Sequence, residues 1–136
     1  MKLLILTSEP ITVGQLRDAV PDGVEPREAE VVVVAPALQE SGLRFWMSDA
    51  DAAIERAQGV WRQTVDQLGA EGVRASGDTG ESDPLIAVQD VLQTFPADRV
   101  ILFTHAGEDQ GYREDVEPAE IEERFGVPVD HVRLRG

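Results

Sequence analysis

The chain has 136 residues, of which 12 are Lys or Arg and 26 are Asp or Glu, so its formal net charge is −14. Its length suits a single domain over residues 1–136, and its 42% apolar content is that of an ordinary globular protein. It contains no cysteine, which excludes disulfides, cysteine-based zinc sites and thiol nucleophiles. The acidic balance argues against nucleic acid and against an anionic membrane surface as partners.

No targeting or membrane-spanning segment is visible. The apolar run at residues 3–6 is too short for the apolar region of a signal peptide. No stretch reaches the roughly 18–20 apolar residues that a membrane helix needs. We therefore expect a cytoplasmic protein.

Five apolar, β-branched runs alternate with four helical patterns along the chain. The first run, at residues 3–7, is continuously apolar, which is typical of a strand covered on both faces. Thr12 and Gln15 have the spacing of a capping box and predict a helix that ends before Pro21. Four consecutive valines then fill a strand expected at residues 30–35.

A long helix is expected to begin at Ser48, with Gly69 just past its end. Its buried stripe recurs at steps of three and four residues and comprises Ala50, Ile54, Ala57, Trp61, Val65 and Leu68. The third strand, at residues 72–76, is short and weakly apolar, which favours a sheet edge. Residues 77–80, with the sequence Gly-Asp-Thr-Gly, are interpreted as part of a turn.

Asp83 and Pro84 predict the start of a third helix, because proline suits the first helical position. The buried stripe of this helix would comprise Leu85, Val88, Leu92 and Phe95.

A fourth strand is expected at residues 99–104, followed by a loop at 105–116. A fourth helix from about residue 117 to 125 then leads to a fifth strand at 127–134. This alternation predicts right-handed crossovers and a parallel sheet with helices on both faces.

Several stretches also share a characteristic order and spacing. They are the first strand at residues 2–7, the Val-rich strand at 31–34 with its long loop and helix, the segment Gly77-Asp78 to Asp83-Pro84-Leu85-Ile86-Ala87-Val88, the Pro96-Ala97-Asp98 turn into strand four, and the closing Pro128-Val129 with Val132. Together they resemble the universal stress protein family, which lies within the larger group of adenine-nucleotide-binding α/β domains, over nearly the whole chain. The resemblance implies a three-layer, doubly wound (Rossmann-like) fold with five parallel strands in the order 3-2-1-4-5. It also implies a homodimer formed through the last strand, from Val127 to Leu134.

The same sheet order predicts where a ligand would bind. Ligands of open parallel sheets bind beyond the carboxyl ends of the strands where the strand order reverses, which here means between strands one and four. The residues expected there are Thr7, Ser8, Glu9, Thr104, His105 and Gly107. A histidine in such a crevice can act as a base or bind a ligand near neutral pH. The alternative is a histidine that ends the strand and bonds to a neighbouring loop.

The sequence departs from the ATP-binding members of the family at both strands. Those members carry an Asp at the end of strand one, where this chain has Thr7-Ser8-Glu9. They follow strand four with Gly-x-x-Gly, whereas here Gly107 is followed by Gly111. The segment that would surround the phosphate carries carboxylates at Glu108, Asp109, Glu114, Asp115 and Glu117. We therefore expect no ATP binding in the family's usual manner and no cofactor.

Two functions stay open. The first is a non-enzymatic regulatory or stress-response domain with a degenerate nucleotide crevice and no catalytic residue. The second is a small enzyme acting on a nucleotide or a phosphorylated metabolite through His105 with Thr104 or Ser8. An acid such as Glu9 or Asp109 would then orient the pair.

Three further features of the sequence are candidate sites. The acidic run at residues 108–123 lacks the spacing of an EF-hand and is interpreted as solvated surface, so no metal is expected. Phe45-Trp46-Met47 is interpreted as packing against the second helix, with a lid over the crevice as the alternative. His131 is expected at a surface or pairing position on the last strand.

Overall fold

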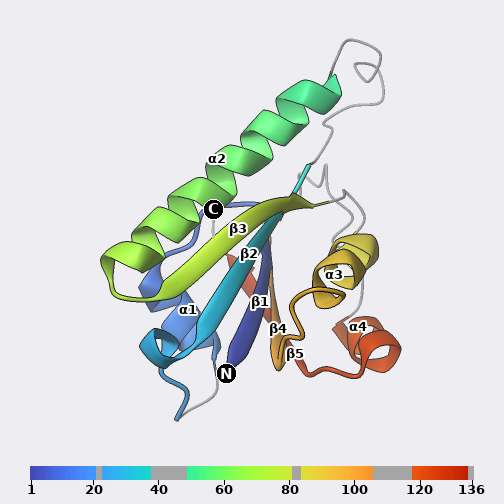
Figure 1. Ribbon diagram of the computed structural model, residues 1–136. Coiled ribbons are helices and arrows are strands. Elements are labelled where there is room, and N and C mark those ends of the chain that lie inside the picture. Colours follow the sequence, from blue (N-terminus) through green and yellow to red (C-terminus); the bar gives the residue numbers. More distant parts are fainter. Residues whose placement is uncertain (21–22, 38–48, 81–83, 106–117, 135–136) are drawn as a thin grey trace.

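The computed structural model describes residues 1–20, 23–37, 49–80, 84–105 and 118–134. In chain order its elements are β1 (Lys2–Thr7), α1 (Val13–Ala19), the 3₁₀ helix η1 (Pro26–Glu28), β2 (Glu30–Pro36), α2 (Asp49–Ala70), β3 (Arg74–Gly80), α3 (Pro84–Leu92), β4 (Arg99–His105), α4 (Pro118–Phe125) and β5 (Val129–Leu134) (Figure 1).

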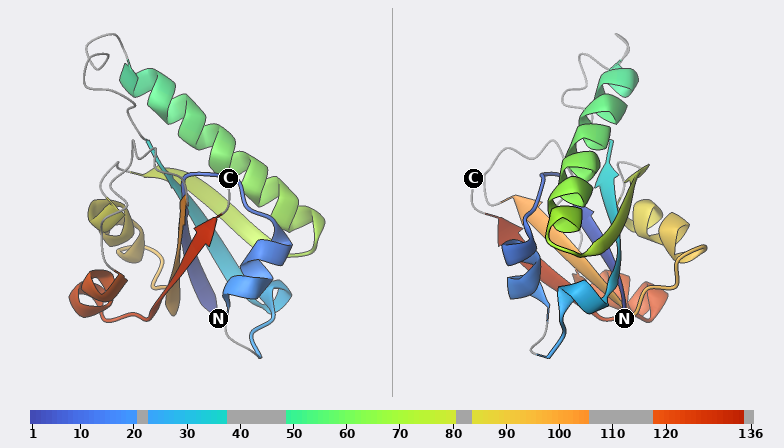
Figure 2. Two further views of the ribbon diagram at one scale, coloured as in Figure 1. Left: turned by 180° about the vertical axis from the view of Figure 1, so that it is seen from behind. Right: turned by 60° about the vertical axis from the view of Figure 1, so that its left-hand side comes forward.

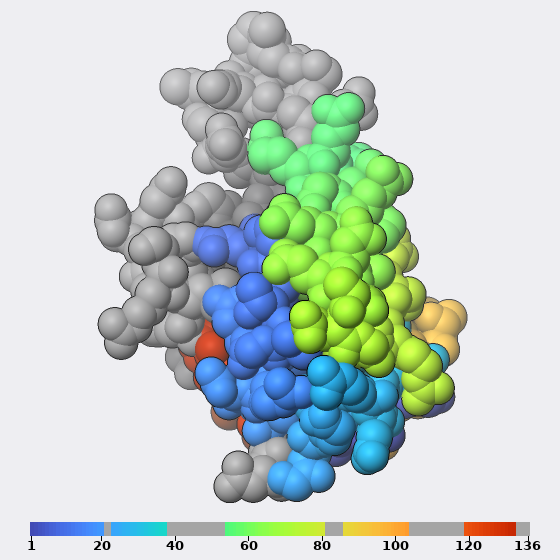
Figure 3. Space-filling view, turned by 90° about the vertical axis from the view of Figure 1, so that its left-hand side faces the viewer, coloured from blue at the N-terminus to red at the C-terminus, as the bar shows by residue number. Residues whose placement is uncertain are grey.

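The five strands form one parallel sheet in the order β3-β2-β1-β4-β5. Helices α1 and α2 cover one face, and α3 and α4 cover the other (Figures 1 and 2). Figure 3 shows α1 and α2 side by side on the first of these faces. The predicted three-layer, doubly wound α/β architecture is therefore confirmed, with its strand order.

The continuous apolar run of β1 follows from its place in the middle of the sheet, with helices on both faces. Leu3 and Ile5 point into the core under α1 and α2, whereas Leu4 and Leu6 point into the core under α3 and α4. All four side chains are at most 1% exposed. Because side chains of a strand alternate between faces, a strand covered on both sides needs apolar residues at every position.

The first helix begins as its sequence predicts. The Thr12 hydroxyl accepts a hydrogen bond from the Gln15 N–H, and the Gln15 side chain accepts one from the Thr12 N–H. This reciprocal pair is the expected capping box, which satisfies two N–H groups that the first turn leaves without partners.

The end of α2 differs from the sequence prediction. Gly69 lies inside the helix, and the glycine that ends it is Gly72, whose φ is +87°. The Gly72 N–H donates to the Gly69 carbonyl and the Val73 N–H donates to the Leu68 carbonyl, which is the Schellman arrangement. Val73 and Leu68 are both buried in one core, so the turn also has its apolar contact.

Several expected boundaries and one stripe residue also require correction. β3 runs on through Gly80, so residues 77–80 are strand rather than turn, although β3 does lie at an edge. β4 includes His105, which was expected in a loop, and β5 begins at Val129. Ile54, expected in the buried stripe of α2, is 41% exposed.

Candidate functional site

The candidate site lies where β1 and β4 end side by side. These two strands are neighbours in the middle of the sheet, and Thr7 of β1 pairs with Phe103 of β4. The chain continues from β1 to a helix on one face, whereas it continues from β4 to a helix on the other (Figure 1). The structure thus has a reversal of strand order at this edge, which is where open parallel sheets bind ligands.

Thr7 is used to shape the end of β1. Its side chain is 1% exposed, and its hydroxyl donates to the Glu9 carbonyl at 2.7 Å and accepts from the Glu9 N–H at 3.2 Å. This local turn takes the chain out of the sheet straight after β1. A ligand at this edge would therefore meet Ser8 and Glu9, both half-buried, before it met the Thr7 hydroxyl.

A residue that the sequence analysis missed fixes the segment after this turn. Thr64 of α2 is fully buried, and its hydroxyl accepts from the Ile11 N–H at 3.2 Å while it donates to the Val60 carbonyl at 2.9 Å. The signal was present in the sequence, because Thr64 lies four residues before Leu68 and therefore on the buried face of the helix. A hydroxyl on that face requires a partner.

β4 delivers Thr104 and His105 to the same edge. Their backbones pair with Arg133 and Leu134 of β5. His105 lies two residues beyond the Phe103 that pairs with Thr7, which corresponds to roughly 7 Å along the strand. The structure therefore places the backbones of the β1 and β4 candidates near one another, while Gly107 lies outside the described residues. Their role as ligand-binding residues stays a prediction.

The Gly-Asp-Thr-Gly segment has a packing explanation. A Cβ on Gly77 would lie 2.5 Å from Cε3 of Trp61, and a Cβ on Gly80 would lie 2.6 Å from Val34. Both contacts are far closer than van der Waals distance, so β3 needs glycine at these two positions. The segment is therefore part of an outer strand that packs against α2 on one side and α3 on the other, rather than the turn that the sequence predicts.

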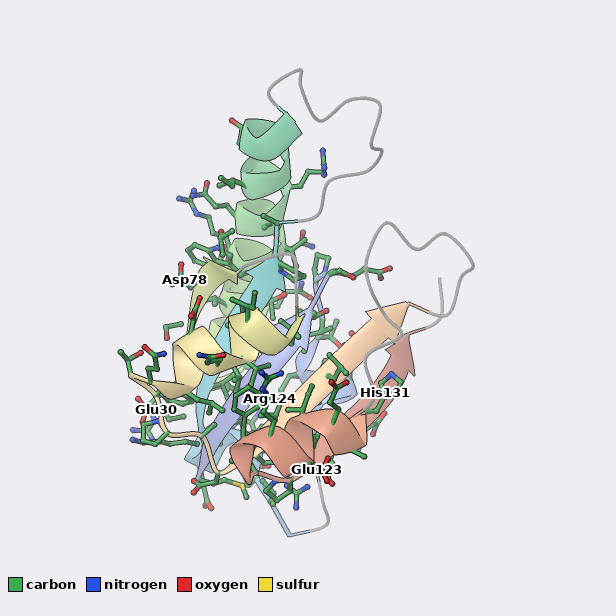
Figure 4. All side chains as sticks on the ribbon, turned by 90° about the vertical axis from the view of Figure 1, so that its right-hand side faces the viewer. Glu30, Asp78, Glu123, Arg124 and His131 are labelled. Carbon is green, nitrogen blue, oxygen red and sulfur yellow. The ribbon has the colours of Figure 1, made fainter. Side chains whose placement is uncertain are left out.

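The remaining candidates divide between described and undescribed residues. His131 is exposed on β5, at the sheet edge opposite β3 (Figure 4). Phe45-Trp46-Met47 lies outside the described residues, as does the acidic run up to residue 117. The described acids of that run are Glu120, Glu122 and Glu123, all exposed on α4.

The described part of the chain contains no group of three or more His, Asp or Glu side chains that could hold a metal ion. No helix among these residues combines the length and the apolar character needed to cross a membrane. Comparison with known proteins found no matching family model and no matching curated protein.

Proposed function

We propose that this chain is a regulatory or stress-response domain of the universal-stress-protein type, which binds rather than catalyses. The observation that carries the proposal is the sheet order β3-β2-β1-β4-β5, with the ends of β1 and β4 adjacent. This is the order that the resemblance implies for the family. The crevice expected at these strand ends would take a small nucleotide-like ligand.

The proposal includes a crevice that does not hold ATP in the family's usual manner. At the β1 end, the Thr7 hydroxyl already satisfies both polar groups of the Glu9 backbone. The Asp that the ATP-binding members carry at the end of this strand is replaced here by Thr7-Ser8-Glu9. After β4, the sequence offers acids in place of the glycine-rich segment that would cradle phosphates.

A thermal-shift titration tests this point. ATP, ADP, AMP and a cyclic dinucleotide would be compared, each with and without Mg²⁺. A ligand present at 100 times its Kd adds about 2.7 kcal/mol to the free energy of unfolding, so tight binding gives a clear rise in melting temperature. We expect ATP with Mg²⁺ to give no rise. A rise that saturates with ATP would contradict the proposed loss of the phosphate site.

We also propose a homodimer formed through β5. β5 is an outer strand of the sheet, and outer strands offer backbone groups to a second chain. Size-exclusion chromatography with light scattering should give twice the 14.8 kDa of one chain. A mass of one chain at micromolar concentration and above would rule the dimer out.

The alternative function is a small enzyme acting on a nucleotide or a phosphorylated metabolite. Its support is the position of His105, the last residue of β4, at the edge where β1 also ends. The chain has two histidines, so His131→Ala is a matched control for His105→Ala. If a turnover is found that His105→Ala abolishes and His131→Ala retains, the enzyme is the correct function.

A further inference from the structure

Each of the two outer strands has backbone groups that point away from the sheet, and the hydrogen-bond pattern identifies which ones. In a parallel pair, the N–H and C=O of one residue bond to the neighbouring strand, and those of the next residue point away. On β3, the Gly80 carbonyl accepts from the Ala37 N–H at 3.0 Å, so the backbone groups of Gly80 face β2. Those of Thr79 consequently face the open edge.

The outward N–H of Thr79 is not left to solvent. It donates to Oδ1 of Asp78 at 2.8 Å. Asp78 is exposed on β3, and Figure 4 labels it at the opposite side of the sheet from His131. Hydrogen bonds to an ionised carboxylate are stronger than bonds between neutral groups. A strand approaching β3 would have to displace this bond before it could pair with Thr79.

At the opposite edge of the sheet a carboxylate also accepts from an outward N–H, but this carboxylate belongs to a helix and not to the outer strand itself. The Val100 N–H donates to the Pro128 carbonyl at 2.9 Å, so Pro128 faces β4 and Val129 faces outward. The Val129 N–H donates to Oε2 of Glu122, on α4, at 2.9 Å. Both outer strands therefore have an outward N–H occupied by a carboxylate of their own chain.

We propose that Asp78 and Glu122 guard the two sheet edges against head-to-tail association, in which β3 of one copy of this chain pairs with β5 of another. Edge strands are templates for association, and pairing of β3 with β5 of another copy would be head-to-tail and could repeat without end. Neighbouring strands lie about 4.8 Å apart, so a partner strand would also confine each carboxylate in a poorly solvated place. In the proposed dimer β5 would pair with β5, so that dimer leaves Asp78 and the β3 edge unaffected.

The test compares two double variants that lose the same two negative charges. Asp78→Ala/Glu122→Ala removes both guards. Asp66→Ala/Glu123→Ala removes two exposed carboxylates, on α2 and α4, that cap no strand (Figure 4 labels Glu123). Mass is measured by light scattering from micromolar to millimolar concentration, after circular dichroism has shown that each variant is folded.

We expect the mass of the unguarded variant to rise with concentration to at least about double that of the wild type, while the control keeps the wild-type mass. Equal behaviour of the two double variants would overturn the proposal. If loss of Glu122 unfolds the protein, Asp78→Ala against Asp66→Ala applies the same criterion to the β3 edge alone. The wild-type mass separately tests the β5 dimer, so failure of one proposal is distinguishable from failure of the other.

Discussion

Trp61 of α2, the longest helix, packs against Gly77 of the outer strand β3. The indole occupies the place where a side chain at position 77 would begin, and its Nε1 donates to the Thr79 hydroxyl at 3.1 Å. The guanidinium of Arg62 lies 5.6 Å from the centre of the Trp61 ring. One residue without a side chain thus permits both the packing and the hydrogen bond.

Gly77→Ala should therefore lower the free energy of unfolding by about 1–3 kcal/mol, the usual cost of inserting atoms into a packed site. Gly59→Ala is the control, because a Cβ at Gly59 meets nothing within 4 Å. In the interior of α2 it should raise stability by about 0.5–1 kcal/mol. Urea unfolding measures both, and a Gly77→Ala protein as stable as the wild type would contradict the contact.

Thr64 is a second residue whose contribution to stability can be measured separately. Thr64→Val keeps the side-chain shape and removes the acceptor of the Ile11 N–H, so stability should fall by about 1–3 kcal/mol. Thr94→Val changes an exposed hydroxyl and should stay within about 0.5 kcal/mol of the wild type. Urea unfolding compares the two variants, and equal free energies of unfolding would mean that the Thr64 hydrogen bond contributes nothing to stability.

At the scale of elements, the end of α2 depends on a left-handed residue rather than on the first glycine after the apolar stripe. Gly72→Ala forces a side chain into φ +87° and should cost about 1–2 kcal/mol. Gly69→Ala adds a Cβ in open space within the helix and should gain about 0.5–1 kcal/mol. A lower melting temperature for Gly72→Ala and a higher one for Gly69→Ala, each relative to the wild type, would support this assignment. The opposite pair of changes would mean that Gly69 is the residue that ends the helix.

Local sequence determined most of the elements and the start of α1, but not several of the other ends. The β1 run, the valines of β2 and the Thr12 capping box each act within a few residues, so they could be recognised directly. The strand character of residues 77–80 could not, because the glycines there serve contacts with Trp61 and Val34, which are remote in sequence. For the candidate site, the topology predicted that the ends of β1 and β4 meet, but the Thr64 bond to Ile11 depends on how α2 lies over the sheet.

At the scale of the whole molecule, stability should decline from the middle of the sheet to its edges. β1 has strands on both sides and buried leucines on both faces, whereas β3 has an open edge. Hydrogen exchange monitored by NMR should show the slowest amides in β1, at Leu4 and Ile5. The outward amide of Gly77 on β3 should exchange at least about 100-fold faster, and comparable protection would contradict the edge assignment.

The place of β1 between β2 and β4 also matters while the protein is being made. β2 follows β1 after the two short helices α1 and η1, but residues 8–98 must be synthesised before Arg99 can pair with Leu3. At about 5–20 residues per second, that takes roughly 5 to 20 s on the ribosome. Throughout this interval the flank of β1 that awaits β4 exposes backbone groups beside leucine and isoleucine. An unpaired strand edge of this kind is prone to aggregation, so this interval is the one in which the growing chain is most exposed to it.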